Sequence, residues 1–315
     1  MKHILTVTLN PAIDKTITLE KFNLGTLNRV KEIKIDPGGK GINVAKVLKK
    51  FGMNVLATGL IAGKQGQLLL DYLNKANINN DFFIIEGETR TNIKIFDEHT
   101  STITEINEQG FYVNEKDIEK FIDKFTKLLD NTSLLILSGS LPLGLDSKIY
   151  YELIQIANKK GVYTILDADG DALRYGINGI PYAIKPNINE LNGLFNVNLQ
   201  DSRDIIKVSK QLIELGIKII LVSNSEKGAY LITTANAYKI NTFRIDCKSS
   251  VGAGDSMVAT LAYCLINNFN IFEIAKWVTA AGTITASKPG TEVCSIEEVK
   301  KSLDLINVED LSCWL

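Results

Sequence analysis

The sequence has 315 residues, 45% of them hydrophobic and 23% charged, which allows one large α/β domain with a small appendage as well as two domains. Its 35 lysines and arginines nearly balance 36 acidic residues, and no long block of one charge occurs. Nucleic acid and an anionic membrane are therefore not expected as main partners.

The chain start and the cysteines favour a cytoplasmic protein. The first residues form a short β-rich run that lacks the long apolar core of a signal peptide. The longest uncharged run, 256–272, contains three asparagines and fits a buried helix better than a membrane span. Four cysteines lie far apart without a C-x-x-C pair, so neither a zinc cage nor a disulfide framework is indicated.

Along most of the chain, short apolar runs alternate with segments of helical periodicity. A glycine that supplies a left-handed helix stop separates helix from strand at Gly52, Gly161 and Gly216. This alternation predicts a doubly wound, mostly parallel sheet flanked by helices. The expected strands are 4–9, 54–61, 134–139, 162–169, 182–187 and 217–224, and the expected helices are 41–52, 66–76, 150–161 and 208–216.

Two excursions break this alternation. Their residues alternate polar and apolar with period two, which is typical of antiparallel strands with one wet face. We therefore expect one small antiparallel sheet, built from insertions at about 15–36 and 81–107 into a single domain spanning 1–315. A hairpin at 228–243 and helices at 254–268, 271–286 and 295–303 complete the expected elements.

The stretch SSVGAGDS at 249–256 places an acid directly after two glycines, before an apolar helix. The first N–H groups of a helix have no helical partner, and glycines let the backbone approach an anion closely. An aspartate in that turn can also be a plain helix cap. Walker A and protein-kinase motifs are missing, and the only histidines, His3 and His99, have no partner at metal-ligand spacing.

A second glycine cluster, DPGGKGIN at 36–43, precedes an amphipathic helix. Turn chemistry alone accounts for Pro-Gly-Gly. However, NPAID at 10–14 follows the first strand, on the side where open α/β sheets bind ligands. Asp14 and Asn43 have side chains suited to sugar hydroxyls.

Five motifs together resemble the ribokinase-like (PfkB-type) superfamily of carbohydrate kinases over essentially the whole chain. TLNPAID, TRTNIK and VGAGDSM are most similar to the phosphohexose branch, above all bacterial 1-phosphofructokinase, with tagatose-6-phosphate kinase close behind. The resemblance implies a ribokinase-like fold with a small antiparallel β lid, and a kinase that uses ATP and Mg²⁺. The five motifs are NPAID (10–14), PGGKGINVAKVL (37–48), SGSLP (138–142), KPNINE (185–190) and VGAGDS (251–256).

The resemblance also implies roles for individual residues. Asp255 would be the general base, and the N–H groups of Gly252, Ala253 and Gly254 would hold the charge on the transferred phosphoryl group. Two arginines would meet the phosphate that the sugar already carries: Arg90 and, from the other lid strand, Arg29. The sugar contacts would be Asp14, Gly38, Gly39, Lys40 and Asn43, with Ser138 near the substrate.

On the nucleotide side, the resemblance implies that Lys185 binds the ATP phosphates and that Asn187 and Glu190 bind Mg²⁺ and its waters. Ser223 and Gly228 would belong to a nucleotide loop, which departs from the family pattern S-x-G-x-x-G at Ser225. A further departure is Ser249, where ribokinase-type members have an aspartate often tied to potassium, so no potassium requirement is carried over. Asp167 and Asp169 follow a strand and either touch Mg²⁺ or nucleotide or cap the following turn, the simpler interpretation.

The expected reaction converts D-fructose 1-phosphate to fructose 1,6-bisphosphate. Tagatose 6-phosphate, fructose 6-phosphate and a free sugar are alternatives within the same chemistry, and a non-catalytic sugar or nucleotide sensor is the alternative of another class. An intact Asp255 argues against a sensor, which needs no base. We also expect a homodimer through the lid strands, because one apolar face of the small sheet needs cover: Ile17, Leu19, Ile93, Ile95 and Ile103.

Overall fold

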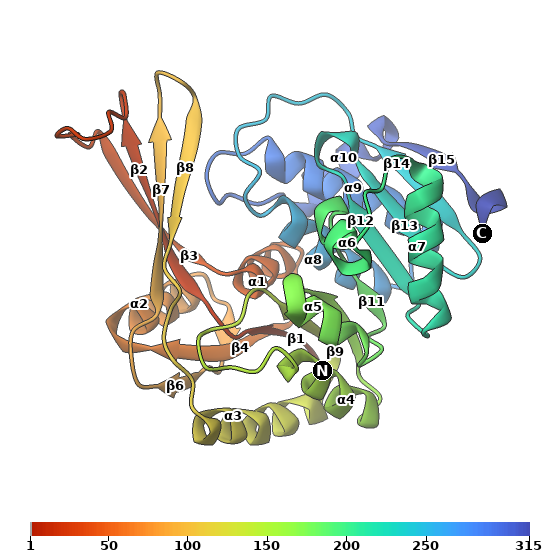
Figure 1. The fold of residues 1–315 in the computed structure, drawn as a ribbon, viewed down its shortest axis with the longest axis horizontal. Helices are drawn as coiled ribbons and strands as arrows, with labels where there is room; N and C mark the ends of the chain where they lie inside the picture. The colour runs from red at the N-terminus through yellow and green to blue at the C-terminus, as the bar shows by residue number, and fades with distance from the viewer. Residues whose placement is uncertain (1) are drawn as a thin grey trace.

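The computed structural model describes residues 2–315, and a large sheet of eleven strands forms its centre (Figure 1). The neighbours from β12 to β5 pair in parallel, whereas the three strands at the other end pair antiparallel. The path runs through β15 (Asn307–Asp310), β14 (Ala237–Asn241), β13 (Ala229–Ile232), β12 (Ile219–Ser223), β11 (Ala183–Ile184), β10 (Tyr163–Asp167), β9 (Thr132–Ser138), β1 (His3–Thr8), β4 (Val55–Ala62) and β5 (Asn79–Asn80), with β6 (Phe83–Ile85) beside β4.

Helices cover both faces of this sheet, and each face has its own hydrophobic core. Strand residues alternate between the cores: Leu134 and Ile136 of β9 pack into one, Leu135 and Leu137 into the other. Strands buried on both faces read as continuous apolar runs, so the doubly wound prediction is confirmed. The first core takes α1 (Lys40–Lys50), α2 (Gly63–Lys75), α8 (Ala253–Ile266), α9 (Ile271–Ala286) and α10 (Ile296–Ser302), and the second takes α3 (Glu115–Leu128), α4 (Ile149–Lys159), α5 (Gly170–Ile177), α6 (Ile188–Phe195) and α7 (Ser202–Glu214).

A separate four-stranded sheet stands to one side of the large one (Figure 1). Its order is β3 (Glu32–Gly38), β2 (Ala12–Leu19), β7 (Arg90–Asp97) and β8 (Thr102–Asn107). The two outer pairings are antiparallel, and the central pairing of β2 with β7 is parallel. The small sheet is thus built from two excursions of the chain, as the sequence predicts.

The segment 81–86, expected in the small sheet, instead belongs to the large one. Its strand β6 pairs in parallel with β4, so the second excursion begins at Arg90. The physical reason is burial on both sides: Phe82 packs into one core of the large sheet and Ile85 into the other. Period-two alternation alone does not reveal which sheet a strand joins.

Residues paired directly across the small sheet share a face. Ile17 lies opposite both Ile33 and Ile95, and Ile93 lies opposite Ile106, so these isoleucines form one apolar face. Ile33 and Ile106 are 49% and 53% exposed. The sequence-based set needs correction at two positions, because Leu19 is buried and Ile103, paired with Phe96, lies on the opposite face.

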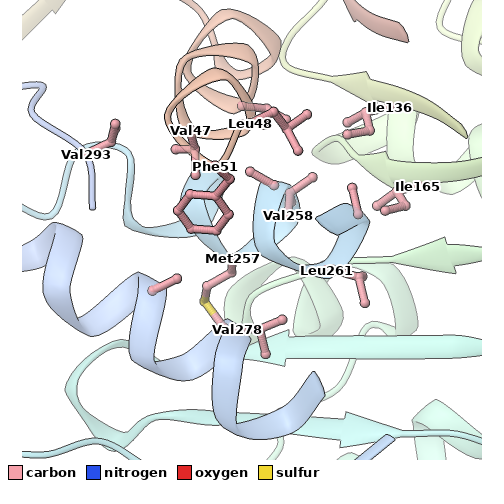
Figure 2. Packing of buried hydrophobic residues seen from close by; sticks show 14 of the residues in the cluster. Val47, Leu48, Phe51, Ile136, Ile165, Met257, Val258, Leu261, Val278 and Val293 are labelled. Carbon is pink, nitrogen blue, oxygen red and sulfur yellow. The ribbon is translucent and has the colours of Figure 1, made fainter. Parts of the chain in front are cut away.

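The start of α8 is held by close packing against α1 and α9 (Figure 2). Truncating such buried side chains typically costs about 2–5 kcal/mol, so the helix is a rigid support for its first turn. The packed residues are Val47, Leu48 and Phe51 of α1, Met257, Val258 and Leu261 of α8, and Val278 of α9.

The cysteines and the helices test two further expectations from the sequence, namely that there is no disulfide framework and no membrane span. All four cysteines are free: Cys264 and Cys294 are buried, and Cys247 and Cys313 are exposed. Within residues 2–315, no helix combines the length and apolar character that crossing a membrane requires.

Candidate active site

A cleft of about 940 Å³ lies beside the carboxyl ends of β10, β11 and β12 and the first turn of α8. This volume is in the range of sites that take nucleotides and other small molecules. Its lining includes Lys40, Asp167, Lys185, Glu190 and Asp255. Charged groups predicted from separate parts of the sequence thus meet in one cavity.

The first turn of α8 is shaped by Gly252, whose φ of +78° is in the left-handed region that favours glycine. Ala253, Gly254 and Asp255 follow as the first helical residues, and their N–H groups have no carbonyl partner within the helix. The N–H of Ala253 makes only a long turn contact, 3.4 Å, with the carbonyl oxygen of Ser250. The turn therefore presents backbone donors and the positive end of the helix dipole to the cleft.

Asp255 is 7% exposed, and its Oδ2 accepts a hydrogen bond of 2.8 Å from Nδ2 of Asn43. Burial, supported by the nearby carboxylate of Asp167, raises the pKa of Asp255 to about 6, although Asn43, Lys40 and Lys185 oppose the rise. At neutral pH the carboxylate is mostly ionised yet basic enough to accept a proton. These are the properties of a general base.

Asp167 binds two lysines at the end of β10. Its Oδ1 lies 3.2 Å from Nζ of Lys40 and 3.3 Å from Nζ of Lys185. Burial favours the neutral acid, but Lys185 and Lys40 outweigh it and lower the pKa of Asp167. Burial likewise opposes the charge on Lys40, yet the carboxylates of Asp167, Glu190 and Asp255 raise its pKa. The ammonium groups of Lys40 and Lys185 therefore stand next to the first turn of α8.

Asp167 is thus an ion-pairing residue rather than a helix cap. Asp169 is exposed at the cap position of α5, and its side chain makes no cap hydrogen bond. Ser138 is fully buried at the end of β9, with its hydroxyl 3.5 Å from Oδ2 of Asp167.

Asp14, Gly38, Gly39 and Asn43, four of the expected sugar contacts, gather where the small sheet meets α1, whereas the side chain of Lys40 pairs with Asp167 in the cleft. Asp14 is buried and accepts hydrogen bonds of 3.0 Å from both Asn92 and Lys94. A Cβ at position 38 would lie 2.7 Å from this carboxylate, so Gly38 is required there. Gly39, with φ of +111°, turns the chain into α1, whose first turn carries Asn43.

Arg90 begins β7 opposite Ala12, close to the same end of the small sheet. Its Nη2 donates to the carbonyl oxygen of Asn10 and to Oγ of Ser140, each at 3.3 Å, and its Nη1 donates to the carbonyl oxygen of Glu108. Among the described residues, its buried Nε has no hydrogen-bond partner. The guanidinium therefore keeps donor capacity for an anion.

Arg29 is not brought to this site within one chain. It is exposed in the loop between β2 and β3, before the point where Glu32 pairs with Thr18. Asp14 and Arg90 lie toward the other end of the same sheet, where Ala12 pairs with Gly38 and with Arg90.

Asn187 and Glu190 form a capping box at the start of α6, with reciprocal hydrogen bonds of 2.8 Å. Burial raises the pKa of Glu190. The box uses only one carboxylate oxygen, Oε2, and Oε1 takes no part in it. Across residues 2–315 no cluster of three His, Cys, Asp or Glu side chains could cage a metal. One carboxylate that lines the cleft fits Mg²⁺, which keeps several waters and takes few protein ligands.

The loop after β12 lines the cleft through Ser223, Ser225 and Gly228. Gly228 has φ of +92°, and a Cβ there would lie 1.9 Å from the carbonyl oxygen of Ile240. Ser225 stands where the family pattern has glycine, and it adopts φ of +48°. The loop therefore keeps a left-handed turn although the residue has changed.

Sequence reasoning missed the groups that hold the predicted residues in place. Asn92 and Lys94 hold Asp14 through hydrogen bonds. They are two residues apart on one strand, and this spacing indicates that both side chains lie on the same face of the sheet. Lys46, three residues after Asn43 and therefore on the same helix face, donates to Oδ1 of Asn43 at 3.2 Å. Ser140, which contacts Arg90, gave no signal beyond its place in SGSLP.

Comparison with known proteins identifies close relatives of the whole chain. The family model described as pfkB family carbohydrate kinase matches residues 7–298. A tagatose-6-phosphate kinase of Staphylococcus epidermidis is 37% identical over 311 residues, which are 97% of this chain and 100% of that protein. A crystal structure of a possible 1-phosphofructokinase from Thermotoga maritima superimposes with a TM-score of 0.91 at 32% identity, covering 98% of this chain and 99% of that one. The structure of the tetrameric inhibited form of phosphofructokinase-2 from Escherichia coli superimposes with a TM-score of 0.89 at 28% identity. The match covers 97% of this chain and 99% of that one.

Proposed function

This chain belongs to the pfkB family of carbohydrate kinases, and from that premise we propose that it transfers the γ-phosphate of ATP to D-fructose 1-phosphate. It is a phosphohexose kinase, and the proposal concerns its substrate and its residues. The observation that carries the proposal is the setting of Asp255. This buried carboxylate lies in the first turn of α8, lines the cleft with Lys40 and Lys185, and accepts a hydrogen bond from Asn43 on the sugar side.

In the proposed mechanism, Asp255 accepts the proton of the attacking sugar hydroxyl. The free N–H groups of the glycine turn and the ammonium groups of Lys40 and Lys185 stabilise the negative charge on the transferred phosphoryl group. Phosphoryl transfer needs little covalent chemistry from the protein, so positioning and electrostatics supply most of the acceleration. General-base assistance adds about 10²–10⁴-fold.

Asn187 and Glu190 are the residues we assign to Mg²⁺ and its waters, and Ser223 and Gly228 to the nucleotide. A Mg²⁺ ion held there would supply charge neutralisation for the nucleotide phosphates. Support for this assignment comes from the uncommitted Oε1 of Glu190 and from the shared cleft that these residues line.

Arg90 supports a phosphorylated substrate, because its guanidinium lies near Asp14 and carries an unpaired buried donor. Tagatose 6-phosphate is the second candidate, favoured by the name of the 37% identical relative. The resemblance to phosphofructokinase-2 keeps fructose 6-phosphate as a third. All three sugars would place one hydroxyl at Asp255 and one phosphate at Arg90.

The proposal is tested by turnover with ATP and Mg²⁺ over a panel of phosphorylated and free hexoses. Fructose 1-phosphate should give the highest kcat/KM, and a higher value for another sugar would overturn the proposed substrate. Asp255→Asn should lose about 10²–10⁴-fold in kcat while nucleotide binding, measured by calorimetry, is kept. Asp123→Asn, an exposed acid on α3, is the matched control and should retain full turnover. Equal activity of the two variants would reject Asp255 as base.

We further propose that the small sheet acts as a lid and joins two copies of the chain into a homodimer. Its exposed isoleucine face supports this, because an unpartnered apolar sheet face is unfavourable in water. The related phosphofructokinase-2 has a tetrameric form. Four free thiols, two of them exposed, support a reducing compartment such as the cytoplasm.

A further inference from the structure

Lys46 is linked to the proposed base through a single side chain. Its Nζ donates to Oδ1 of Asn43 at 3.2 Å and to the carbonyl oxygen of Pro37 at 2.5 Å. Nδ2 of the same Asn43 donates to Oδ2 of Asp255 at 2.8 Å. An ammonium, an amide and a carboxylate therefore stand in series, and the two ends come from α1 and α8.

The chemistry of the two ends determines how the amide must point. An ammonium has only donors, and a carboxylate has only acceptors. The amide of Asn43 meets both needs in one orientation alone, with Oδ1 toward Lys46 and Nδ2 toward Asp255. Without Lys46, only the carboxylate of Asp255 would hold the amide in this orientation, and a half-turn that sets Oδ1 against the carboxylate would no longer also cost the bond to Lys46.

We propose that Lys46 is a positioning residue for phosphoryl transfer, because it fixes the Asn43 amide in the orientation that holds Asp255. The inference rests on the proposed function, since it assigns Lys46 to the same reaction. Lys46 itself does not line the cleft and is not expected to touch either substrate.

The surroundings of Lys46 favour this role over that of an ordinary buried ion pair. The ammonium is mostly buried, yet both of its hydrogen bonds go to neutral oxygens. Burial lowers its pKa to about 8, although three carboxylates support the charge, so it remains mostly protonated at neutral pH. The charged groups around it are Asp36 of β3, Asp14 of β2, Asp255 of α8 and Lys94 of β7.

The groups around Asp255 define what removal of Lys46 should change. Besides Asn43, the carboxylate faces Asp167 of β10, Lys40 of α1 and Lys185, which follows β11. None of these three is bonded to Lys46. Loss of the oriented Asn43 donor and loss of the Lys46 charge should each raise the pKa of Asp255, while these three influences stay in place.

Lys46→Met keeps the hydrocarbon stem and removes the donor. In the ligand-free protein we expect the ¹³C titration of the Asp255 carboxyl, identified by its loss in Asp255→Asn, to move up by about one pH unit. The acidic limb of kcat/KM should move with it, so activity falls about fivefold at pH 6 and hardly at pH 8. Lys46→Arg, which keeps a donor, should retain the wild-type titration. Lys49→Met alters an exposed lysine of the same helix and should also change nothing.

A double-mutant cycle separates positioning from simple charge. If Lys46 acts through the amide, Lys46→Met should shift the titration of Asp255 far less in an Asn43→Ala background. An equal shift in both backgrounds would mean that the lysine acts by its charge alone, and the inference would be overturned. Should Lys46→Met not fold, Lys46→Gln takes its place in the cycle, because its nitrogen is one bond too short to reach Asn43.

Failure of this inference can be told apart from failure of the proposed function. The carboxyl titration needs neither substrate nor turnover, whereas the proposed function depends on wild-type activity toward phosphohexoses. A variant with raised sugar KM and an unchanged Asp255 titration would show that Lys46 only supports the Gly38–Gly39 turn through Pro37. That result would overturn the positioning role and leave the kinase assignment standing.

Discussion

Lys185 lies 3.3 Å from Asp167, and the two side chains are only 5% and 1% exposed. Lys40 approaches the same carboxylate oxygen at 3.2 Å. Two cations thus share one anion, and the cluster keeps a net positive charge beside the glycine turn of α8. Asp167 serves as the internal counter-ion of the two lysines that we assign to the phosphate side of the cleft.

Asp167→Asn should destabilise the protein and make its stability depend on an added anion. Breaking a buried ion pair by removing one partner costs about 3–5 kcal/mol, since the remaining charge is left without compensation. ATP phosphates can then take the place of the lost carboxylate, so ATP should raise the melting temperature of the variant more than that of the wild type. Thermal unfolding with and without ATP measures both effects.

The matched control is Asp130→Asn, which removes the acid of a surface pair with Lys160. Asp130 is 71% exposed, so water screens the pair and its loss should have little effect on melting. An ATP-induced shift in Asp167→Asn no larger than in the wild type would contradict the counter-ion interpretation.

The pH dependence of kcat/KM should follow Asp255. Burial raises the pKa of this carboxyl to about 6, and only the ionised form can accept the hydroxyl proton. Activity should therefore be nearly constant above pH 7 and fall tenfold for each pH unit well below 6. Rates with saturating ATP from pH 5 to 8 test this. A rate that stays nearly flat down to pH 5, as the ordinary aspartate pKa near 4 would give, would show that burial does not tune the base.

The sequence predicts those parts of the site whose residues are neighbours in the chain, within one turn of backbone. Two glycines, an acid and an apolar helix follow one another at 252–258, so the place of Asp255 is a local property. The alternation of apolar strands and amphipathic helices likewise predicts the layered fold, because each segment shows which of its faces are buried.

The rest of the site depends on the order and register of the strands, which cannot be read from the local sequence pattern. Asp167 meets Ser138 because β10 pairs with β9 in that register. The small-sheet register also sets Arg29 away from Asp14. Asn43 and Asp255 are 212 residues apart, so their hydrogen bond follows only from the contact between α1 and α8.

Arg90→Ala should raise the KM for the phosphosugar by about 30–100-fold, because a charge-assisted contact to a phosphate is lost. The kcat should change less, since the phosphate carried by the sugar is not the group transferred. Activity toward free fructose should not change. Arg174→Ala, an exposed arginine of α5, is the control. Steady-state kinetics with an unchanged phosphosugar KM would reject the phosphate contact.

Strand β8 carries two exposed isoleucines, Ile103 and Ile106, one on each face of the small sheet. Ile106 lies on the face that Ile93 and Ile17 share, whereas Ile103 lies on the other face, opposite Phe96. Their exposures, 53% and 45%, are similar, so they make a matched pair. Ile106→Glu should weaken the proposed homodimer by about 100-fold in Kd, because it buries an unpaired charge in an apolar interface.

Ile103→Glu should leave the dimer intact, since a charge on the opposite face stays outside the proposed interface. Light scattering over a range of protein concentrations distinguishes these outcomes. A wild-type monomer throughout that range would remove the dimer from the proposal. Equal dissociation of both variants would mean that the isoleucine face is not the contact, and that the strand edge of β8 carries the association instead.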